Sequence, residues 1–208
     1  MEVIQKLDQD TYNSLFVTSD THFNHNKDFI YAKRGYKDPR SMTDDMINII
    51  NDTVGENGTL LHLGDFCLNS THDDVKYIMS RLRIKALWLL WGNHNNPLQR
   101  SYGGTVEQVC AYNSGLFIRY LGHYYTFRRG PKEFVCFHFP ISVWDGMGNG
   151  SMHLCGHSHG GFPLSRPENH TYKILDCGWD IHSKPLTMKE IETIMAKKDV
   201  NSLHHDKK

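Results

Sequence analysis

Five apolar, strand-like runs of this chain each end at a short polar motif. The runs cover residues 15–18, 60–63, 87–91, 134–137 and 152–155. The motifs that follow them are Asp20-Thr21-His22, Gly64-Asp65, Gly92-Asn93-His94, His138 and Gly156-His157-Ser158-His159. Because open α/β sheets bind ligands at the carboxyl ends of their strands, the five motifs predict one shared site at a sheet edge.

The rest of the pattern predicts βαβ units in the first half of the chain and a β-meander in the second. Thr43 is expected to cap a helix to about Val54, and Thr71 one to about Leu82. Strands are expected at residues 84–91, 116–129 with a break at 122–123, 132–137, 152–155 and 172–177, with no helix among the later ones. Thr187 and Glu190 form a capping box for a last helix. Two packed sheets flanked by helices accommodate both halves.

Composition narrows the class of protein. The 208 residues predict a single domain over 1–208 with a short polar tail at about 199–208. Lys plus Arg and Asp plus Glu both number 23, so a long nucleic acid is not favoured as the ligand. No apolar run approaches the roughly 20 residues that span a bilayer, so no membrane role is expected. Five cysteines without a C-x-x-C motif, and no signal peptide, favour a cytoplasmic protein.

The side chains of the motifs are oxygen and nitrogen ligands. Asp20 and Asp65 offer carboxylates and Asn93 an amide oxygen, and the imidazoles are those of His22, His138, His157 and His159. This mixture without thiolate suits Mn, Fe, Zn, Co or Ni better than Ca or Mg. Taken singly, each motif has a structural explanation as a cap, a turn or a core histidine. Their joint occurrence at successive strand ends favours a metal site.

The order D-x-H, G-D, G-N-H, H, G-H-x-H resembles that of the calcineurin-like metallophosphoesterases. The resemblance runs from about Phe16 to the C-terminal helix, and two stretches, "SDTHFNHNKDFI" and "HFPISVWDGMGNGSMHLCGHSHG", are similar to a small bacterial and phage subfamily. It implies a four-layer αββα sandwich of two mixed β-sheets flanked by helices. It also implies two divalent metal ions, with manganese favoured, and hydrolysis of a phosphodiester by a metal-bound hydroxide.

The resemblance also implies roles for individual residues. One metal would be held by Asp20, His22 and His159, and the other by Asn93, His138 and His157. Asp65 would bridge the two ions. His94 would contact a phosphate oxygen and protonate the leaving group, a role that suits an imidazole.

Three further residues are candidates for substrate binding, each with a plainer alternative. His25 can face the site or support its ligands from behind. Arg34 can hold a phosphate oxygen or be a solvated loop arginine, and Trp144 can stack on a base or be a packing residue. One departure concerns Asn95, which stands where the family usually has an acidic residue beside the histidine. Asn95 can still accept a hydrogen bond but supplies no negative charge to His94.

Several functional alternatives remain at this stage. The partner is expected to be a small phosphate ester, nucleotides included. A phosphomonoesterase or nucleotide pyrophosphatase would use the same ligands, and a binding scaffold could keep the fold without catalysis. Every expected ligand position is filled, which favours an enzyme over a scaffold. The sequence leaves the oligomeric state open.

Overall fold

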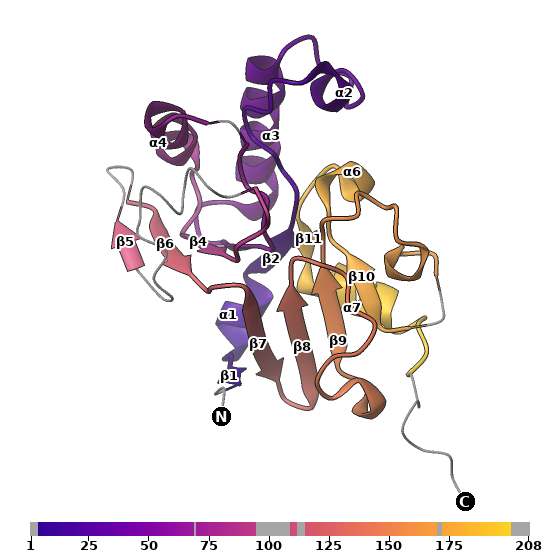
Figure 1. The fold of residues 1–208 in the computed structure, drawn as a ribbon. Coiled ribbons are helices and arrows are strands. Elements are labelled where there is room, and N and C mark those ends of the chain that lie inside the picture. Colours follow the sequence, from indigo (N-terminus) through magenta and orange to yellow (C-terminus); the bar gives the residue numbers. More distant parts are fainter. Residues whose placement is uncertain (1–3, 69, 95–108, 112–114, 170–171, 201–208) are drawn as a thin grey trace, which may run out of the picture.

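Two mixed β-sheets form the body of the protein in a computed structural model (Figure 1). The structure describes residues 4–68, 70–94, 109–111, 115–169 and 172–200. The first sheet has the strand order β11 (Leu186–Thr187), β2 (Leu15–Thr18), β3 (Thr59–His62), β4 (Ala86–Leu89), β6 (Phe117–Tyr120) and β5 (Val109–Ala111). The second has the order β1 (Gln5–Lys6), β7 (Tyr124–Arg129), β8 (Lys132–Phe137), β9 (Met152–Cys155) and β10 (Ile174–Asp176).

The first sheet contains the expected βαβ units. Strands β2, β3, β4 and β6 are parallel neighbours. Helices α3 (Pro39–Val54) and α4 (His72–Arg81) make the crossovers, and their apolar sides pack on the outer face of this sheet. The contacts on that face include Met46 and Ile50 of α3, Ile78 of α4 and Leu60 and Leu87 of the strands. The carboxyl ends of β2, β3 and β4 therefore lie along one edge.

The start of α3 differs from the prediction. The helix begins at Pro39, and the side chain of Asp38 accepts a hydrogen bond from the Ser41 backbone. Proline suits the first helical turn because it has no N–H to satisfy there. Thr43, the expected cap, lies inside the helix, where its hydroxyl accepts a hydrogen bond from the Asn24 backbone. It thereby ties the loop after β2 to the helix.

The other two predicted caps are confirmed. Thr71 and Asp74 form a capping box at the start of α4, and Thr187 and Glu190 form one at the start of α7 (Met188–Met195). In each box the hydroxyl accepts a backbone N–H of the first turn while the carboxylate accepts the N–H of the capping residue.

The β-meander prediction is wrong beyond its first hairpin. Strands β7 and β8 are antiparallel, but β8–β9 and β9–β10 pair in parallel. Parallel neighbours need a crossover of about a dozen residues or more, and the connections 138–151 and 156–173 are long enough to return the chain. The predicted break at 122–123 is present, and there the chain passes from the first sheet to the second.

Three apolar layers stabilise this arrangement, and the first is the layer between the first sheet and helices α3 and α4. Between the sheets, side chains of both inner faces pack with α1 (Gln9–Asn13) and α7. The outer face of the second sheet packs against the loops around two 3-10 turns, Met147–Asn149 and Pro163–Ser165. The layered α/β sandwich is thus confirmed, although loops and short turns cover that outer face where helices were expected. Short helices α2 (Asp28–Tyr31) and α6 (Trp179–His182) flank the strand ends.

Over the ranges described, no helix has the length and apolarity to cross a bilayer.

Candidate metal centre

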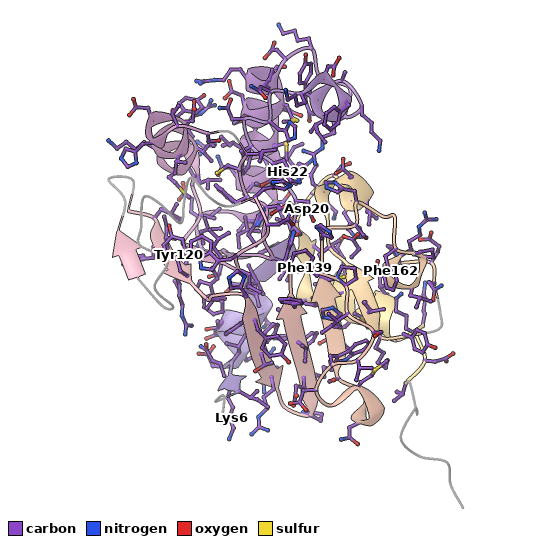
Figure 2. All side chains as sticks on the ribbon, viewed as in Figure 1. Lys6, Asp20, His22, Tyr120, Phe139 and Phe162 are labelled. Carbon is purple, nitrogen blue, oxygen red and sulfur yellow. The ribbon has the colours of Figure 1, made fainter. Side chains whose placement is uncertain are left out.

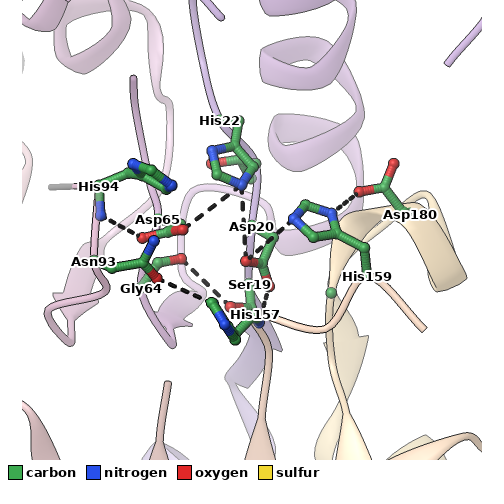
Figure 3. A network of polar contacts seen from close by, with 12 residues as sticks. Ser19, Asp20, His22, Gly64, Asp65, Asn93, His94, His157, His159 and Asp180 are labelled. Carbon is green, nitrogen blue, oxygen red and sulfur yellow. Dashed lines mark hydrogen bonds and ion pairs between the residues drawn. The ribbon is translucent and has the colours of Figure 1, made fainter. Parts of the chain in front are cut away.

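The five sequence motifs converge where the carboxyl ends of the strands of both sheets meet (Figures 2 and 3). The loops after β2, β3, β4, β8 and β9 bring together all eight residues of the predicted centre. These are Asp20, His22, Asp65, Asn93, His94, His138, His157 and His159. Two groups within this set have ligand atoms that all lie within 4.8 Å of one another, and we call them the first and second triads.

The first triad consists of Asp20, His22 and His159. The Asp20 Oδ1 atom lies 3.8 Å from His22 Nε2 and 4.0 Å from His159 Nε2. The two imidazole rings stack with their centroids 5.2 Å apart. Asp20 and His22 are buried, whereas the side chain of His159 is partly exposed. The triad is therefore open to solvent on one side.

The second triad consists of Asp65, His138 and His157, and Asn93 lies among them. The amide oxygen of Asn93 lies 3.0 Å from His138 Nε2 and 3.0 Å from His157 Nδ1. His138 Nδ1 must donate to the Leu63 carbonyl at 3.1 Å, so a neutral His138 has its Nε2 atom unprotonated. That nitrogen and the oxygens of Asn93 and Asp65 then converge as acceptors, and a positive charge between them, a proton or a metal ion, satisfies all three.

Asp65 lies between the triads. Its Oδ2 atom is 3.4 Å from His138 Nε2 and 3.7 Å from His22 Nε2. Its other oxygen accepts a hydrogen bond of 2.8 Å from the His94 backbone. Burial alone would raise the pKa of this carboxyl, but the hydrogen bond and charge of His138 lower it to about 2. Asp65 thus presents an ionised oxygen to both triads, as a bridging ligand must.

Polar atoms left without partners test whether a metal fits the first triad. Asp20 Oδ1 and both ring nitrogens of His22 are buried and have no hydrogen-bond partner. An unpaired buried polar group costs about 1–3 kcal/mol, so three in contact call for a ligand. Burial lowers the pKa of His22 to about 3, which keeps the imidazole neutral, with one ring nitrogen unprotonated. A divalent cation with oxygen and nitrogen ligands satisfies that nitrogen and Asp20 Oδ1.

The backbone is strained at the candidate ligands themselves. Asp20, His22, Asp65, His157 and His159 have φ angles of 55°, 48°, 55°, 64° and 47°. These lie in the left-handed region, which costs a residue other than glycine roughly 1–2 kcal/mol. Strain of this kind clusters at functional sites, where the surrounding structure holds the geometry. The concentration of strain at these ligand positions supports a site that the fold holds in place.

The glycines of the motifs make room for the carboxylates. A Cβ on Gly92 would lie 2.1 Å from Asp65 Oδ1, and one on Gly156 would lie 2.3 Å from Asp20 Oδ2. A Cβ on Gly64 would lie 2.7 Å from His138 Nδ1. Each glycine therefore has a steric role. The sequence alone indicates only that these glycines are turn residues.

Asp180 supports the first triad and was missed by the sequence analysis. Its carboxylate accepts a hydrogen bond of 2.5 Å from His159 Nδ1, which leaves His159 Nε2 facing Asp20. It also pairs with both the Nε and Nη2 atoms of Arg34, at 2.9 and 2.8 Å. A carboxylate behind a metal-binding histidine fixes its tautomer and ring orientation. The available signal was Gly178-Trp179-Asp180, another glycine and aspartate after a strand-like run.

A second carboxylate, Asp176, holds the loop that carries His157 and His159. It is fully buried, and its Oδ2 atom accepts hydrogen bonds from the Ser158 hydroxyl at 2.6 Å and the Gly160 backbone at 3.1 Å. Its Oδ1 atom accepts the Gly178 backbone N–H at 2.8 Å. Asp176 is thereby satisfied on both oxygens and has a supporting rather than a ligand role.

The structure gives Arg34 a supporting position. Its side chain is only 6% exposed, and besides Asp180 it donates to the carbonyls of Asp20 and Thr21 at 2.8 and 2.7 Å. These bonds fix the loop that carries the first triad. A pocket of 310 Å³ borders this pair and His159, and its other lining residues are Lys33, Tyr36, Ile49, Trp179 and Ser183. Arg34 forms one wall of that pocket.

The other two candidates for substrate contact lie in different places. His25 is 5% exposed and lies behind His22, with its ring centroid 5.8 Å away and its Nδ1 accepting the Lys27 N–H. Trp144 lies on the outer face of the second sheet, 7% exposed, and its indole N–H donates to Ser151. Trp144 is therefore placed as a packing residue. His94 is half-buried beside His22, with ring centroids 5.7 Å apart, and Asn95 lies outside the described residues.

Replacing Asp180 with asparagine should weaken metal binding by the first triad about 10- to 100-fold. The amide cannot hold the His159 tautomer as a carboxylate does, and it leaves Arg34 with an unpaired charge. Binding isotherms for Mn²⁺ should show one site with lowered affinity and one site with unchanged affinity. Asp45→Asn is the matched control, because Asp45 is an exposed carboxylate that accepts from Tyr36. Two ions bound with unaltered affinity by Asp180→Asn would contradict this role.

Comparisons with known proteins support the fold. No protein-family model matches this chain, and no curated protein sequence matches it. A solved structure is similar, and it is described as the crystal structure of the protein of unknown function AQ665 from Aquifex aeolicus. The similarity has a TM-score of 0.56 at 16% sequence identity and covers 86% of this chain and 98% of the other. At this identity the likeness shows a shared layered α/β fold and no more.

Proposed function

We propose that the protein is a hydrolase with a two-metal centre, and more narrowly a phosphoesterase that cleaves phosphodiesters. The observation that carries the proposal is the position of Asp65 Oδ2, 3.4 Å from a nitrogen of the second triad and 3.7 Å from one of the first. Two triads of oxygen and nitrogen donors joined by one carboxylate are the arrangement of a two-metal hydrolytic site. The order of the motifs, similar to that of calcineurin-like metallophosphoesterases, gives independent support.

The donor atoms divide between two ions. Asp20, His22 and His159 would hold one, and Asn93, His138 and His157 the other, with Asp65 shared. When bound, two divalent ions would activate water for attack on phosphorus and neutralise charge on the phosphoryl oxygens. Manganese is our first choice, with iron, zinc, cobalt and nickel as alternatives for this donor set.

The chain's own groups would orient the substrate and move the proton. The imidazole of His94 is half-buried beside His22, and its backbone N–H anchors Asp65. His94 is not a member of either triad, so its side chain is available to donate to a phosphoryl oxygen. We also propose His94 as the group that would deliver a proton to the leaving oxygen, a step that general acids accelerate about 10²–10⁴-fold.

The proposed substrate is a small phosphate ester, nucleotides included. The first triad is open on the side of His159, whose side chain is 31% exposed. A diester needs such access, because both of its arms must extend away from the phosphorus. We also propose that the protein works in the cytoplasm, because Cys67, Cys136, Cys155 and Cys177 are buried free thiols, as is usual in a reducing compartment.

The experiment that tests the function removes and restores the metal. Protein stripped with a chelator should lose hydrolysis of bis(p-nitrophenyl) phosphate, and two equivalents of Mn²⁺ should restore it. The restored protein should have a higher kcat/KM for this diester than for the monoester p-nitrophenyl phosphate. Metal content is measured by elemental analysis beside each assay. Full turnover in metal-free protein would refute the proposal, and a tenfold preference for the monoester would make it a monoesterase.

A further inference from the structure

Aromatic rings adjoin the candidate centre on two flanks. On the side of the first triad, the ring of Phe29 in α2 contacts His25 edge-on, with centroids 5.7 Å apart. The ring of His25 in turn lies 5.8 Å from that of His22. This series of rings leads from the surface of α2 to a proposed metal ligand.

The other flank belongs to the second triad. The ring of Phe139, directly after His138, lies 4.6 Å from the ring of His157 and 5.0 Å from that of His138. Phe137 continues the row, 5.5 Å from Phe139. Figure 2 labels Phe139 just beyond the end of β8.

Exposure and ring contacts together distinguish these two phenylalanines. Phe29 is 65% exposed, and the described residues include three more exposed large apolar side chains, namely Phe117, Val143 and Val200. Of these four, Phe29 is the one with a ring contact that leads into the triads. Phe139 is half-buried, so part of its surface remains open. These two rings are therefore distinguished by their contacts with the histidines of the centre rather than by exposure alone.

We propose that Phe29 and Phe139 determine specificity by stacking on planar groups of nucleobase type, one on each arm of a phosphodiester. The inference rests on the proposed function, because it places the phosphate at Asp65 between the two triads. An aromatic ring favours a planar heterocycle over an aliphatic arm through stacking, which tolerates different bases. One ring on each flank, Phe139 directly against the second triad and Phe29 linked to the first through His25, matches a diester, whose two arms leave the phosphorus in different directions. Phe139 thus takes the stacking role that Trp144, buried on the outer face of the second sheet, cannot fill.

The kinetic test compares two diesters that share a leaving group. Thymidine p-nitrophenyl phosphate and methyl p-nitrophenyl phosphate both release p-nitrophenolate, but only the first retains a base. The wild type should prefer the thymidine ester in kcat/KM by tenfold or more. Because this ester has a single base, the leucine variant at the ring that the base occupies should reduce the preference about fivefold or more, and the double variant should abolish it. Leucine retains apolar volume without a ring, so folding is preserved.

Two controls isolate stacking from other effects. Phe117→Leu alters another exposed phenylalanine, 54% exposed on β6, and should leave the preference unchanged. Phe139→Tyr and Phe29→Tyr retain a ring and should keep the preference within about twofold. Both esters carry the same p-nitrophenyl arm, so a loss of turnover shared by the two esters reports on that arm or on the ligands that Phe139 contacts, whereas the ratio of their kcat/KM values reports on the base.

A binding measurement separates this inference from the proposed function. Mn²⁺-loaded protein is titrated with thymidine monophosphate and with methyl phosphate, and the ratio of the two Kd values is compared across the variants. A ratio of tenfold or more that falls in the leucine variants supports stacking, even if no diester is hydrolysed and the proposed function fails. Efficient hydrolysis of both diesters with ratios unaffected by either leucine variant overturns the inference and leaves the phosphoesterase standing. Equal binding of the two monophosphates by the wild type also overturns it.

Discussion

Replacing Asp65 with asparagine should lower kcat for phosphodiester hydrolysis by about three orders of magnitude, which corresponds to about 4 kcal/mol of barrier. Asp65 Oδ2 lies within 3.7 Å of a nitrogen of each triad, so this one carboxylate serves both proposed ions. The amide has no net charge to offset two divalent cations. Elemental analysis should therefore find fewer than two ions per chain, and added Mn²⁺ should restore turnover only in part.

A control for this variant must remove a carboxylate elsewhere. Asp44→Asn is suitable, because Asp44 is partly exposed and contacts Arg81, Tyr77 and Arg40 rather than a proposed ligand. It should retain two ions and wild-type turnover, and any effect should be confined to the free energy of unfolding. Wild-type turnover with two ions in Asp65→Asn would show that Asp65 does not bridge.

The location of the candidate centre was predictable because it depends on local signals. Apolar runs such as 60–63 predict strands, and polar residues directly after them mark the strand ends. In parallel strands those ends meet at one edge, so Asp20, Asp65 and His94 could be expected to lie together before the fold was known. The capping boxes at Thr71 and Thr187 were predictable for the same reason, since each depends on residues three positions apart.

The residues that sequence reading missed depend on long-range contacts. Asp180 contacts His159 and pairs with Arg34, which is 146 positions away in the chain, and neither contact has a signal in the sequence. The parallel pairing of β9 with β10 was missed because an apolar run predicts a strand but not its direction. Phe139 follows the predicted strand 132–137, and only the packed structure brings its ring against His157. The roles of Asp180 and Phe139 thus required tertiary geometry.

Substitution of Gly92 is the second change for which we expect a large loss of turnover, because this glycine makes room for Asp65. Gly92 lies against Asp65 so closely that a Cβ would be 2.1 Å from Oδ1 and 2.5 Å from the Asp65 backbone nitrogen. Contacts below 3.0 Å force a movement, and here one of the two atoms belongs to the backbone. Asp65 is already fixed by the His94 N–H at 2.8 Å, so a shift at Gly92 must displace the bridging oxygen or His94.

Gly92→Ala should therefore lower kcat about a hundredfold or more, about 2.7 kcal/mol of barrier, and release at least one ion while the fold persists. Circular dichroism, metal content and turnover of the same sample test this expectation. Gly35→Ala is the matched control, because Gly35 has a φ of 85° and no atom within 4 Å of its Cβ position. Its backbone strain of roughly 1–2 kcal/mol should lower stability without affecting the ions. If Gly92→Ala keeps two ions and full turnover, Asp65 tolerates displacement, and the carboxylate is not the rigid link between the triads that its contacts indicate.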